Sequence, residues 1–141
     1  MSAAPKSFAI VIDDDPPYLS LLEMILGELL TCPIRTYGNP ELALAEIPSL
    51  KVGIIISDFY MPQMDGVQFL KQLKPIKPDV PCILITGHKE LLDRMDLSDL
   101  DLLKAILAKP FKIDQLAKCI SQHWPEAVAP GRFQKARVKD A

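Results

Sequence analysis

Five short apolar runs, each followed by a longer stretch with helical spacing, constrain the fold more than any other feature of this sequence. The runs do not alternate apolar with polar residues, which is typical of strands in a parallel sheet buried on both faces. Their order predicts five strand–helix units, (βα)5, in a doubly wound α/β sandwich. The expected strands cover 8–12, 34–37, 53–57, 82–86 and 105–108, and the expected helices cover 16–30, 39–47, 66–74, 89–100 and 112–124.

Length and charge exclude several classes of protein. The chain has 141 residues, and a roughly half apolar composition suits one domain with a single core. Its formal net charge of −2 argues against a general nucleic-acid binder. No segment approaches the ~20 apolar residues of a membrane span, and no apolar signal region precedes the first strand. We therefore expect a cytoplasmic protein with neither direct nucleic-acid nor membrane binding.

The composition changes after Trp124. The segment 125–141 has little apolar content, contains proline and glycine, and carries four basic residues. This composition is typical of a flexible basic tail or a severed linker. We therefore expect one domain over 8–124, with no second domain after it.

Polar side chains stand where four of the expected strands end. Ligands of open parallel sheets lie outside the carboxyl ends of the strands. Carboxylates gathered there repel one another unless a cation lies between them, and oxygen ligands without histidine or cysteine favour Mg²⁺ or Mn²⁺. The residues are Asp13, Asp14 and Asp15 after the first strand, Asp58 after the third, Thr86 at the end of the fourth and Lys109 after the fifth.

A carboxylate beside a divalent cation, a lysine and a hydroxyl is suited to accept a phosphoryl group. Phosphoryl transfer depends mainly on positioning and on cancelling charge at the equatorial oxygens. Asp58 is then the nucleophile, as in other aspartyl-phosphate chemistry. Taken singly, an acidic cluster after a strand is often only a solvated helix cap, and a threonine there is often a turn cap. Their joint placement favours the functional interpretation.

Four segments in order carry a resemblance to a known family. They are "VIDDDPPYL", "SDFYMPQMDG", "ILITG" and "AKPF". Over about 8–124 the chain resembles the receiver domain of two-component response regulators, in the CheY-like superfamily. The resemblance implies a flavodoxin-like sandwich whose five-stranded parallel sheet has the order 2-1-3-4-5.

The resemblance also implies roles for individual residues. It makes the chain a phosphoacceptor of a phosphorelay, which takes a phosphoryl group from a histidine kinase or a histidine phosphotransfer protein in a Mg²⁺-dependent step. Such a domain is a signalling module that catalyses only its own phosphoryl transfer and dephosphorylation. By position, Asp58 is the phosphoacceptor, and the Mg²⁺ ligands are Asp13, Asp14, Asp58 and the Tyr60 backbone carbonyl. Thr86 and Lys109 hold phosphoryl oxygens, and Tyr60 and His88 tune hydrolysis of the phosphoaspartate. The Lys109-Pro110 bond is expected to be cis.

One region departs from the family pattern. Receivers usually carry an aromatic residue three positions before the lysine, where this chain has Ile106. A branched aliphatic side chain cannot present two distinct surfaces as a turning ring does. We therefore expect the signal to pass through the fourth helix region, whose excess of Leu and Met suits a homodimer or another partner contact.

Two other functions remain open. A haloacid-dehalogenase-type phosphohydrolase also forms an aspartyl phosphate, but it places a second aspartate two residues after the nucleophile, where this chain has Tyr60. An interaction module that is never phosphorylated would not need the full set of aspartates, threonine and lysine. The sequence also leaves open whether the chain stands alone or was cut from a larger regulator or hybrid kinase.

Overall fold

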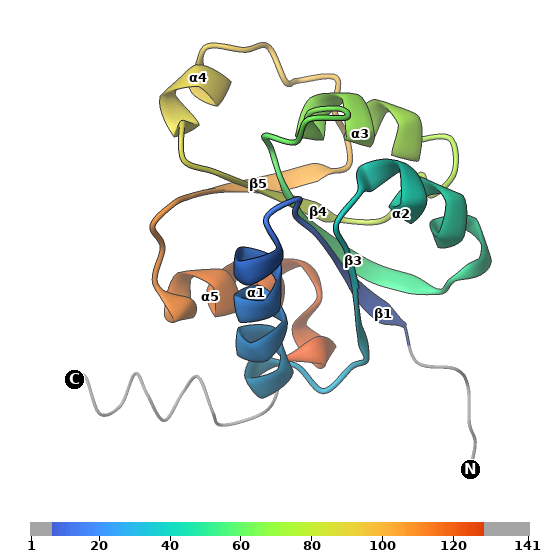
Figure 1. Ribbon diagram of the computed structural model, residues 1–141, viewed down its shortest axis with the longest axis vertical. Helices are drawn as coiled ribbons and strands as arrows, with labels where there is room; N and C mark the ends of the chain where they lie inside the picture. The colour runs from blue at the N-terminus through green and yellow to red at the C-terminus, as the bar shows by residue number, and fades with distance from the viewer. Residues whose placement is uncertain (1–6, 129–141) are drawn as a thin grey trace.

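Helices cover both faces of a central sheet in the computed structural model, which describes residues 7–128 (Figure 1). No helix among these residues combines the length and the apolar character needed to cross a bilayer. The strands are β1 (Phe8–Ile12), β2 (Ile34–Tyr37), β3 (Val52–Asp58), β4 (Cys82–Thr86) and β5 (Leu103–Ala108). The helices are α1 (Pro16–Leu29), α2 (Pro40–Glu46), α3 (Gly66–Leu73), α4 (Lys89–Asp93) and α5 (Ile113–His123), with short 3₁₀ turns η1 (Ile47–Ser49) and η2 (Pro125–Ala127).

The sheet confirms the expected topology. All of its strand pairs are parallel, and the order is β2-β1-β3-β4-β5. This is the flavodoxin-like α/β sandwich, in which β2 and β5 are the edge strands. Strand β5 begins two residues before the expected position, at Leu103.

The central strands are apolar throughout because both of their faces are covered. Along β3, Ile55 packs in the core that α2 and α3 close, whereas Ile54 and Ile56 pack in the core that α1 and α5 close. Phe69 of α3 and Leu26 of α1 are fully buried on these two sides. Figure 1 shows α1 and α5 on one side of the sheet and α2 and α3 on the other. Alternate residues of one strand therefore serve two cores.

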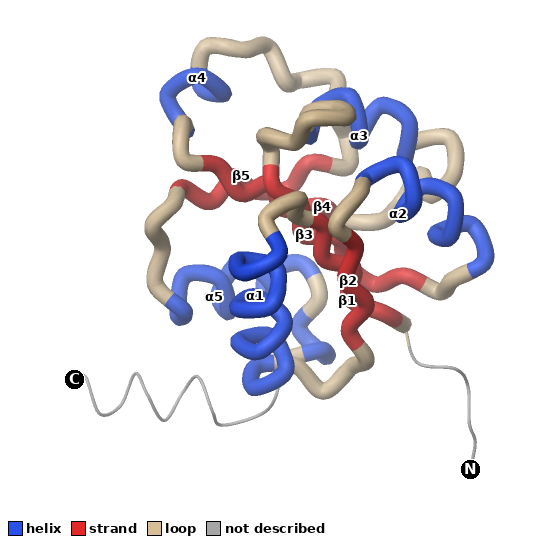
Figure 2. The backbone as a smooth tube through the Cα atoms, in the orientation of Figure 1, coloured by secondary structure: helices blue, strands red, loops and turns tan. Residues whose placement is uncertain are grey.

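The fourth helix is shorter than expected. We expected a helix over 89–100, but α4 ends at Asp93 and turns follow (Figure 2). The side chain of Asp96 accepts hydrogen bonds from the Ser98 backbone N–H at 3.1 Å and from the Ser98 hydroxyl at 2.6 Å. Such local bonds compete with the helical backbone pattern, which accounts for the early end. The expectation of a long fourth helix is therefore wrong.

Residues 125–128 pack against the end of α1. The backbone N–H of Thr31 donates to the carbonyl of Ala127 at 2.7 Å, and Leu30 pairs with Val128 in an antiparallel bridge. Ala127 is buried. The packed region thus continues four residues past the expected boundary at 124, and the rest of the expected tail lies outside the described residues.

Gly53 at the start of β3 gives a test of this packing, because a Cβ there would overlap the ring of Trp124. We expect Gly53→Ala to lower the free energy of unfolding by about 1–3 kcal/mol, as overpacking does. It should also shift the fluorescence of Trp124, the single tryptophan of the chain. Urea unfolding and emission spectra measure both effects.

Gly27→Ala is the matched control. Gly27 lies inside α1 and is exposed, and a Cβ at this position would meet no neighbouring element within 4 Å. The same substitution there should raise stability by about 0.5–1 kcal/mol, because alanine has the higher helix propensity. Unchanged stability and emission in Gly53→Ala would show that the ring does not rest on this glycine.

Candidate functional site

The carboxyl edge of the sheet brings the expected residues together. Asp58 is the last residue of β3 and Thr86 the last of β4, while Asp13 and Lys109 directly follow β1 and β5. The strand register pairs Asp58 with Ile85 and Thr86 with Ala108. Thr86 therefore lies on the strand between the one that carries Asp58 and the one that leads to Lys109.

Lys109 places a positively charged ammonium group at this edge. Its Nζ lies 3.1 Å from Oδ1 of Asp58 and 4.0 Å from Oδ2 of Asp13. Its backbone N–H donates to the Thr86 carbonyl at 2.7 Å, which continues the β4–β5 ladder by one residue. The Lys109-Pro110 bond is cis, as the family resemblance implies. The contact with Asp58 shows that the lysine side chain reaches the end of the third strand.

Three carboxylates lie close together beside this lysine. One oxygen each of Asp13, Asp14 and Asp58 lies within 4.8 Å of the others. Asp13 is 1% exposed; its Oδ1 accepts a hydrogen bond from the Asp15 backbone N–H at 2.9 Å, and its buried Oδ2 accepts none. Burial, with a further contribution from Asp58, raises the pKa of Asp13 to about 6.

The carboxylate of Asp58 also lies in an environment that disfavours its negative charge. Burial raises the pKa of its carboxyl, and the ion pair with Lys109 and a hydrogen bond from the Tyr60 backbone act in the opposite direction. One lysine therefore balances only part of the negative charge at this edge.

The donor set fits a divalent cation. All three side chains offer carboxylate oxygens, none of the group is His or Cys, and one buried oxygen of Asp13 lacks a hydrogen-bond partner. Hard oxygen donors of this kind suit Mg²⁺ or Mn²⁺. Asp14 also lines a hollow of about 530 Å³ together with Tyr60, whose side chain is 75% exposed. Asp14 and Tyr60 therefore border the same hollow.

Thr86 presents a hydroxyl at the same edge. The residue is buried, and its Oγ1 accepts a hydrogen bond from the His88 backbone N–H at 2.9 Å. Since the oxygen serves as an acceptor there, the hydroxyl hydrogen can be donated to another group. His88 itself is exposed in front of α4.

Two other residues singled out in the sequence lie apart from the carboxylate cluster. Asp15 stands at the N-cap of α1, where its side chain is exposed and makes no capping hydrogen bond. Ile106 is half-buried in the middle of β5. Asp15 therefore contributes its backbone N–H, rather than its carboxylate, to the arrangement.

Tyr18 is a residue of this edge that the sequence analysis missed. Lys109 Nζ lies 4.1 Å from the centroid of its ring. Burial, together with the charges of Asp13 and Asp58, raises the pKa of Tyr18 to about 12, so the phenol stays neutral. A signal was available, because an aromatic residue in the first turn of a helix that starts at the carboxyl edge must lie near the strand ends.

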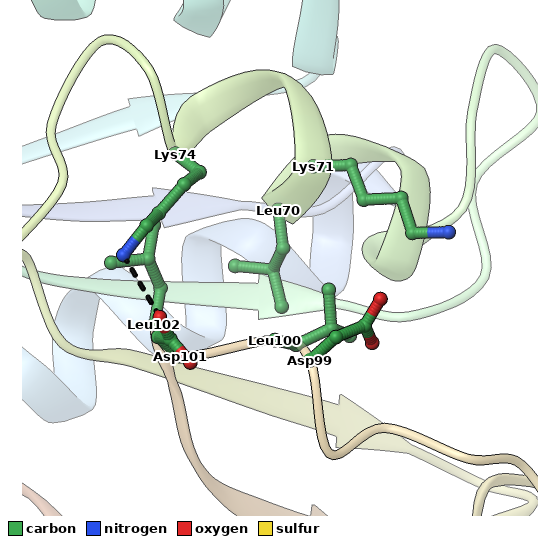
Figure 3. Close-up of a pocket in the computed structure, with 7 residues that line it drawn as sticks. All are labelled: Leu70, Lys71, Lys74, Asp99, Leu100, Asp101 and Leu102. Atoms are coloured by element: carbon green, nitrogen blue, oxygen red, sulfur yellow. Dashed lines mark hydrogen bonds and ion pairs between the residues drawn. The ribbon is translucent and has the colours of Figure 1, made fainter.

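A second hollow, of about 200 Å³, lies at the opposite edge of the sheet (Figure 3). Lys74 at the end of α3 pairs with Asp101 at 3.2 Å, and both groups are largely exposed. The neighbouring Leu102 carbonyl accepts the Cys82 N–H, which marks the amino ends of β4 and β5. This hollow has no connection with the carboxylate cluster. Its lining residues are Leu70, Lys71, Lys74, Asp99, Leu100, Asp101 and Leu102.

Comparison with known protein families gives one match over most of the chain. The family model of the response regulator receiver domain matches residues 9–121. The chain is 35% identical over 118 residues to the C4-dicarboxylate transport transcriptional regulatory protein DctD of Rhizobium meliloti, covering 84% of this chain and 25% of that protein. It is 30% identical to the transcriptional regulatory protein FixJ of Bradyrhizobium diazoefficiens, covering 82% and 55%.

A solved structure agrees with these sequence matches. The response regulator protein TrrA of Thermotoga maritima, in complex with Mg²⁺-BeF, superposes with a TM-score of 0.70 at 25% identity, covering 82% of this chain and 97% of that one. The chain spans between a quarter and about half of the length of the two curated relatives above.

The raised pKa of Asp13 leads to a prediction for the ion-free domain. Between the unfolded value near 4 and about 6, the folded protein binds the proton more tightly, so stability rises as pH falls. The ionised form therefore costs stability at neutral pH. We expect Asp13→Asn to raise the free energy of unfolding by about 1–3 kcal/mol at about pH 7.5 in EDTA, and by much less at about pH 4.5.

Asp15→Asn is the control for charge alone, since it removes the same charge from an exposed side chain two residues away. Urea unfolding of both variants at the two pH values gives the comparison. Equal gains for the two variants, or a gain at Asp13 that does not depend on pH, would contradict burial as the cause.

Proposed function

Because this chain belongs to the response regulator receiver family, we propose that Asp58 is its phosphoacceptor. The observation that carries the proposal is the 3.1 Å contact between Lys109 Nζ and Asp58 Oδ1 at the carboxyl edge. It supports the proposal because the ammonium stands where the charge of an arriving phosphoryl group must be offset. Asp13 and Asp14 lie close to the acceptor as the candidate metal ligands.

In the proposed reaction an Asp58 oxygen attacks the phosphorus of the donor. A new oxygen–phosphorus bond forms while the bond from phosphorus to the leaving group breaks, and the leaving group departs with the electron pair. The lysine ammonium and the Thr86 hydroxyl donate hydrogen bonds to phosphoryl oxygens. These donors are pre-positioned on strand ends, so little reorganisation is needed.

We propose that Mg²⁺ is held by Asp13, Asp14, Asp58 and the Tyr60 carbonyl. Bound there, Mg²⁺ would supply positive charge that offsets the carboxylates and the phosphoryl oxygens. The buried Oδ2 of Asp13, which accepts no hydrogen bond, supports this assignment. Mn²⁺ has the same donor preference and is the alternative ion.

A receiver domain is a signalling module. We propose that this one takes its phosphoryl group from a histidine kinase or a histidine phosphotransfer protein, and that it catalyses only its own phosphorylation and dephosphorylation. DctD and FixJ are transcriptional regulators by name and are longer than this chain. We propose that residues 7–128 make no direct contact with nucleic acid.

We propose that the output surface includes α4 and the turns after it. Leu91 and Met95 are exposed there, at 51% and 42%, although both are large apolar side chains. Ile106 on the neighbouring β5 supplies no ring that could turn between two positions. A second copy of the chain is the partner that we propose for this surface, formed when Asp58 is phosphorylated.

We expect acetyl phosphate with Mg²⁺ to place one acid-stable, base-labile phosphoryl group on Asp58. Mass spectrometry of the intact chain and of its peptides locates the group. EDTA should abolish the modification, because the carboxylates then remain uncompensated.

Asp58→Asn should take up no phosphoryl group, whereas Asp15→Asn should behave like the wild type. Phosphate retained in Asp58→Asn, or none on the wild type, would contradict the assignment. Steady turnover of a simple phosphomonoester would instead support the phosphohydrolase alternative.

For the output surface, we expect beryllofluoride with Mg²⁺ to promote dimerisation, which sedimentation velocity measures. Replacing both Leu91 and Met95 by serine should weaken the dimer by about 10-fold or more, since each side chain would lose apolar burial. Leu42→Ser on α2 is the matched control, because Leu42 is also 51% exposed. A chain that stays monomeric throughout, or equal loss in the control, would refute this surface.

A further inference from the structure

We propose that Tyr18 is a positioning residue for Lys109, whose ammonium group its ring holds beside Asp58 for phosphoryl transfer. The inference rests on the proposed function, since it assigns an additional residue to the same reaction. The observation behind it is the placement of one ammonium group between an aromatic ring and a carboxylate.

The geometry of the contact is that of a cation–π interaction. Lys109 Nζ lies 4.1 Å from the centroid of the Tyr18 ring and 3.1 Å from Asp58 Oδ1. The Lys109 side chain is 30% exposed, so water surrounds only part of it. Cation–π attraction is stronger where the cation is partly desolvated, and it is worth about 2- to 30-fold in an equilibrium constant.

The start of α1 holds the ring in place. The Asp13 carboxylate accepts the backbone N–H of Asp15, which fixes the turn between β1 and α1. Pro16 and Pro17 then occupy the first helical positions, where the proline ring restricts φ to helical values. Tyr18 follows directly and is half-buried. The metal-binding edge and the position of the ring are therefore set by the same turn.

An aromatic ring suits this position better than a second acceptor would. Lysine has a long, flexible stem and a compact ammonium group with three N–H donors. A further carboxylate at the place of Tyr18 would draw the ammonium away from Asp58 and add negative charge against an incoming phosphoryl group. The neutral ring attracts the ammonium without net charge and leaves donors free for Asp58 and for phosphoryl oxygens.

Tyr18 also lines an apolar groove of about 470 Å³ between α1 and the loop that carries Lys109. Leu22 and Phe111 contribute to the same lining. Tyr18 and Phe111 both pack against the hydrophobic core cluster that contains Leu22, which anchors the ring at this edge. Since the interaction uses the ring face, the phenolic hydroxyl is not needed for it.

The test compares Tyr18→Phe, which keeps the ring, with Tyr18→Leu, which removes it. We expect the rate constant for phosphorylation by acetyl phosphate at saturating Mg²⁺ to fall about 3- to 30-fold in Tyr18→Leu and to stay within about twofold of wild type in Tyr18→Phe. Met24→Ala, which removes an exposed apolar side chain from the same helix, should react as the wild type does.

A second readout does not depend on phosphorylation. In NMR spectra of the unmodified domain, the Hε protons of Lys109, assigned through Lys109→Arg, should be shifted upfield by the ring in wild type and Tyr18→Phe. In Tyr18→Leu they should return to the ordinary position of a lysine. If Tyr18→Leu does not unfold cooperatively, Tyr18→Met takes its place in both measurements.

Three results would overturn the proposal: no upfield shift of Lys109 in the wild type, equal rates in wild type and Tyr18→Leu, or a Tyr18→Phe variant as slow as Tyr18→Leu. A wild-type chain that takes up no phosphoryl group on Asp58 would overturn the proposed function and the role of Tyr18 in it. The Lys109 signal would still show separately whether the ring contact exists.

Discussion

Burial of the sheet on both faces is the constraint on which the rest of the structure depends. Because α1 and α5 cover one face and α2 and α3 the other, charged groups of the central strands can reach water only at the strand ends. All strands are parallel, so their carboxyl ends share one edge. The site is therefore a consequence of strand direction, and the turns after the strands decide which side chains meet there.

The charge at that edge is not balanced by the chain alone. Asp13 and Asp58 both have raised pKa values because they are buried, and Lys109 contacts mainly the second of them. When such carboxylates are ionised in the folded state, the free energy of unfolding of the protein falls. Natural proteins accept that cost where a ligand compensates it, and the same imbalance is what makes the edge attractive to a divalent cation.

The sequence predicted the strands and the residues of the carboxyl edge because both follow from strong, repeated signals, and the family resemblance implied the sheet order. Apolar runs fix the strands, and parallel strands fix where Asp58, Thr86 and Lys109 go. It failed where local side-chain hydrogen bonds decided the outcome: the Asp96 side chain accepts two bonds from Ser98, and α4 ends early. It also missed Tyr18, whose place depends on the path of a turn and not on the periodicity of the helix.

The edge strand β5 has a consequence for the behaviour of the domain at high concentration. It is an apolar strand at the margin of the sheet, and among residues 7–128 no strand pairs beyond it. Exposed edges of this kind invite strands of other molecules to add to the sheet. The strand carries one charged residue, Lys104, which is exposed. The side chains of an added strand would crowd and partly desolvate that ammonium, so a charge at this position disfavours edge-to-edge aggregation.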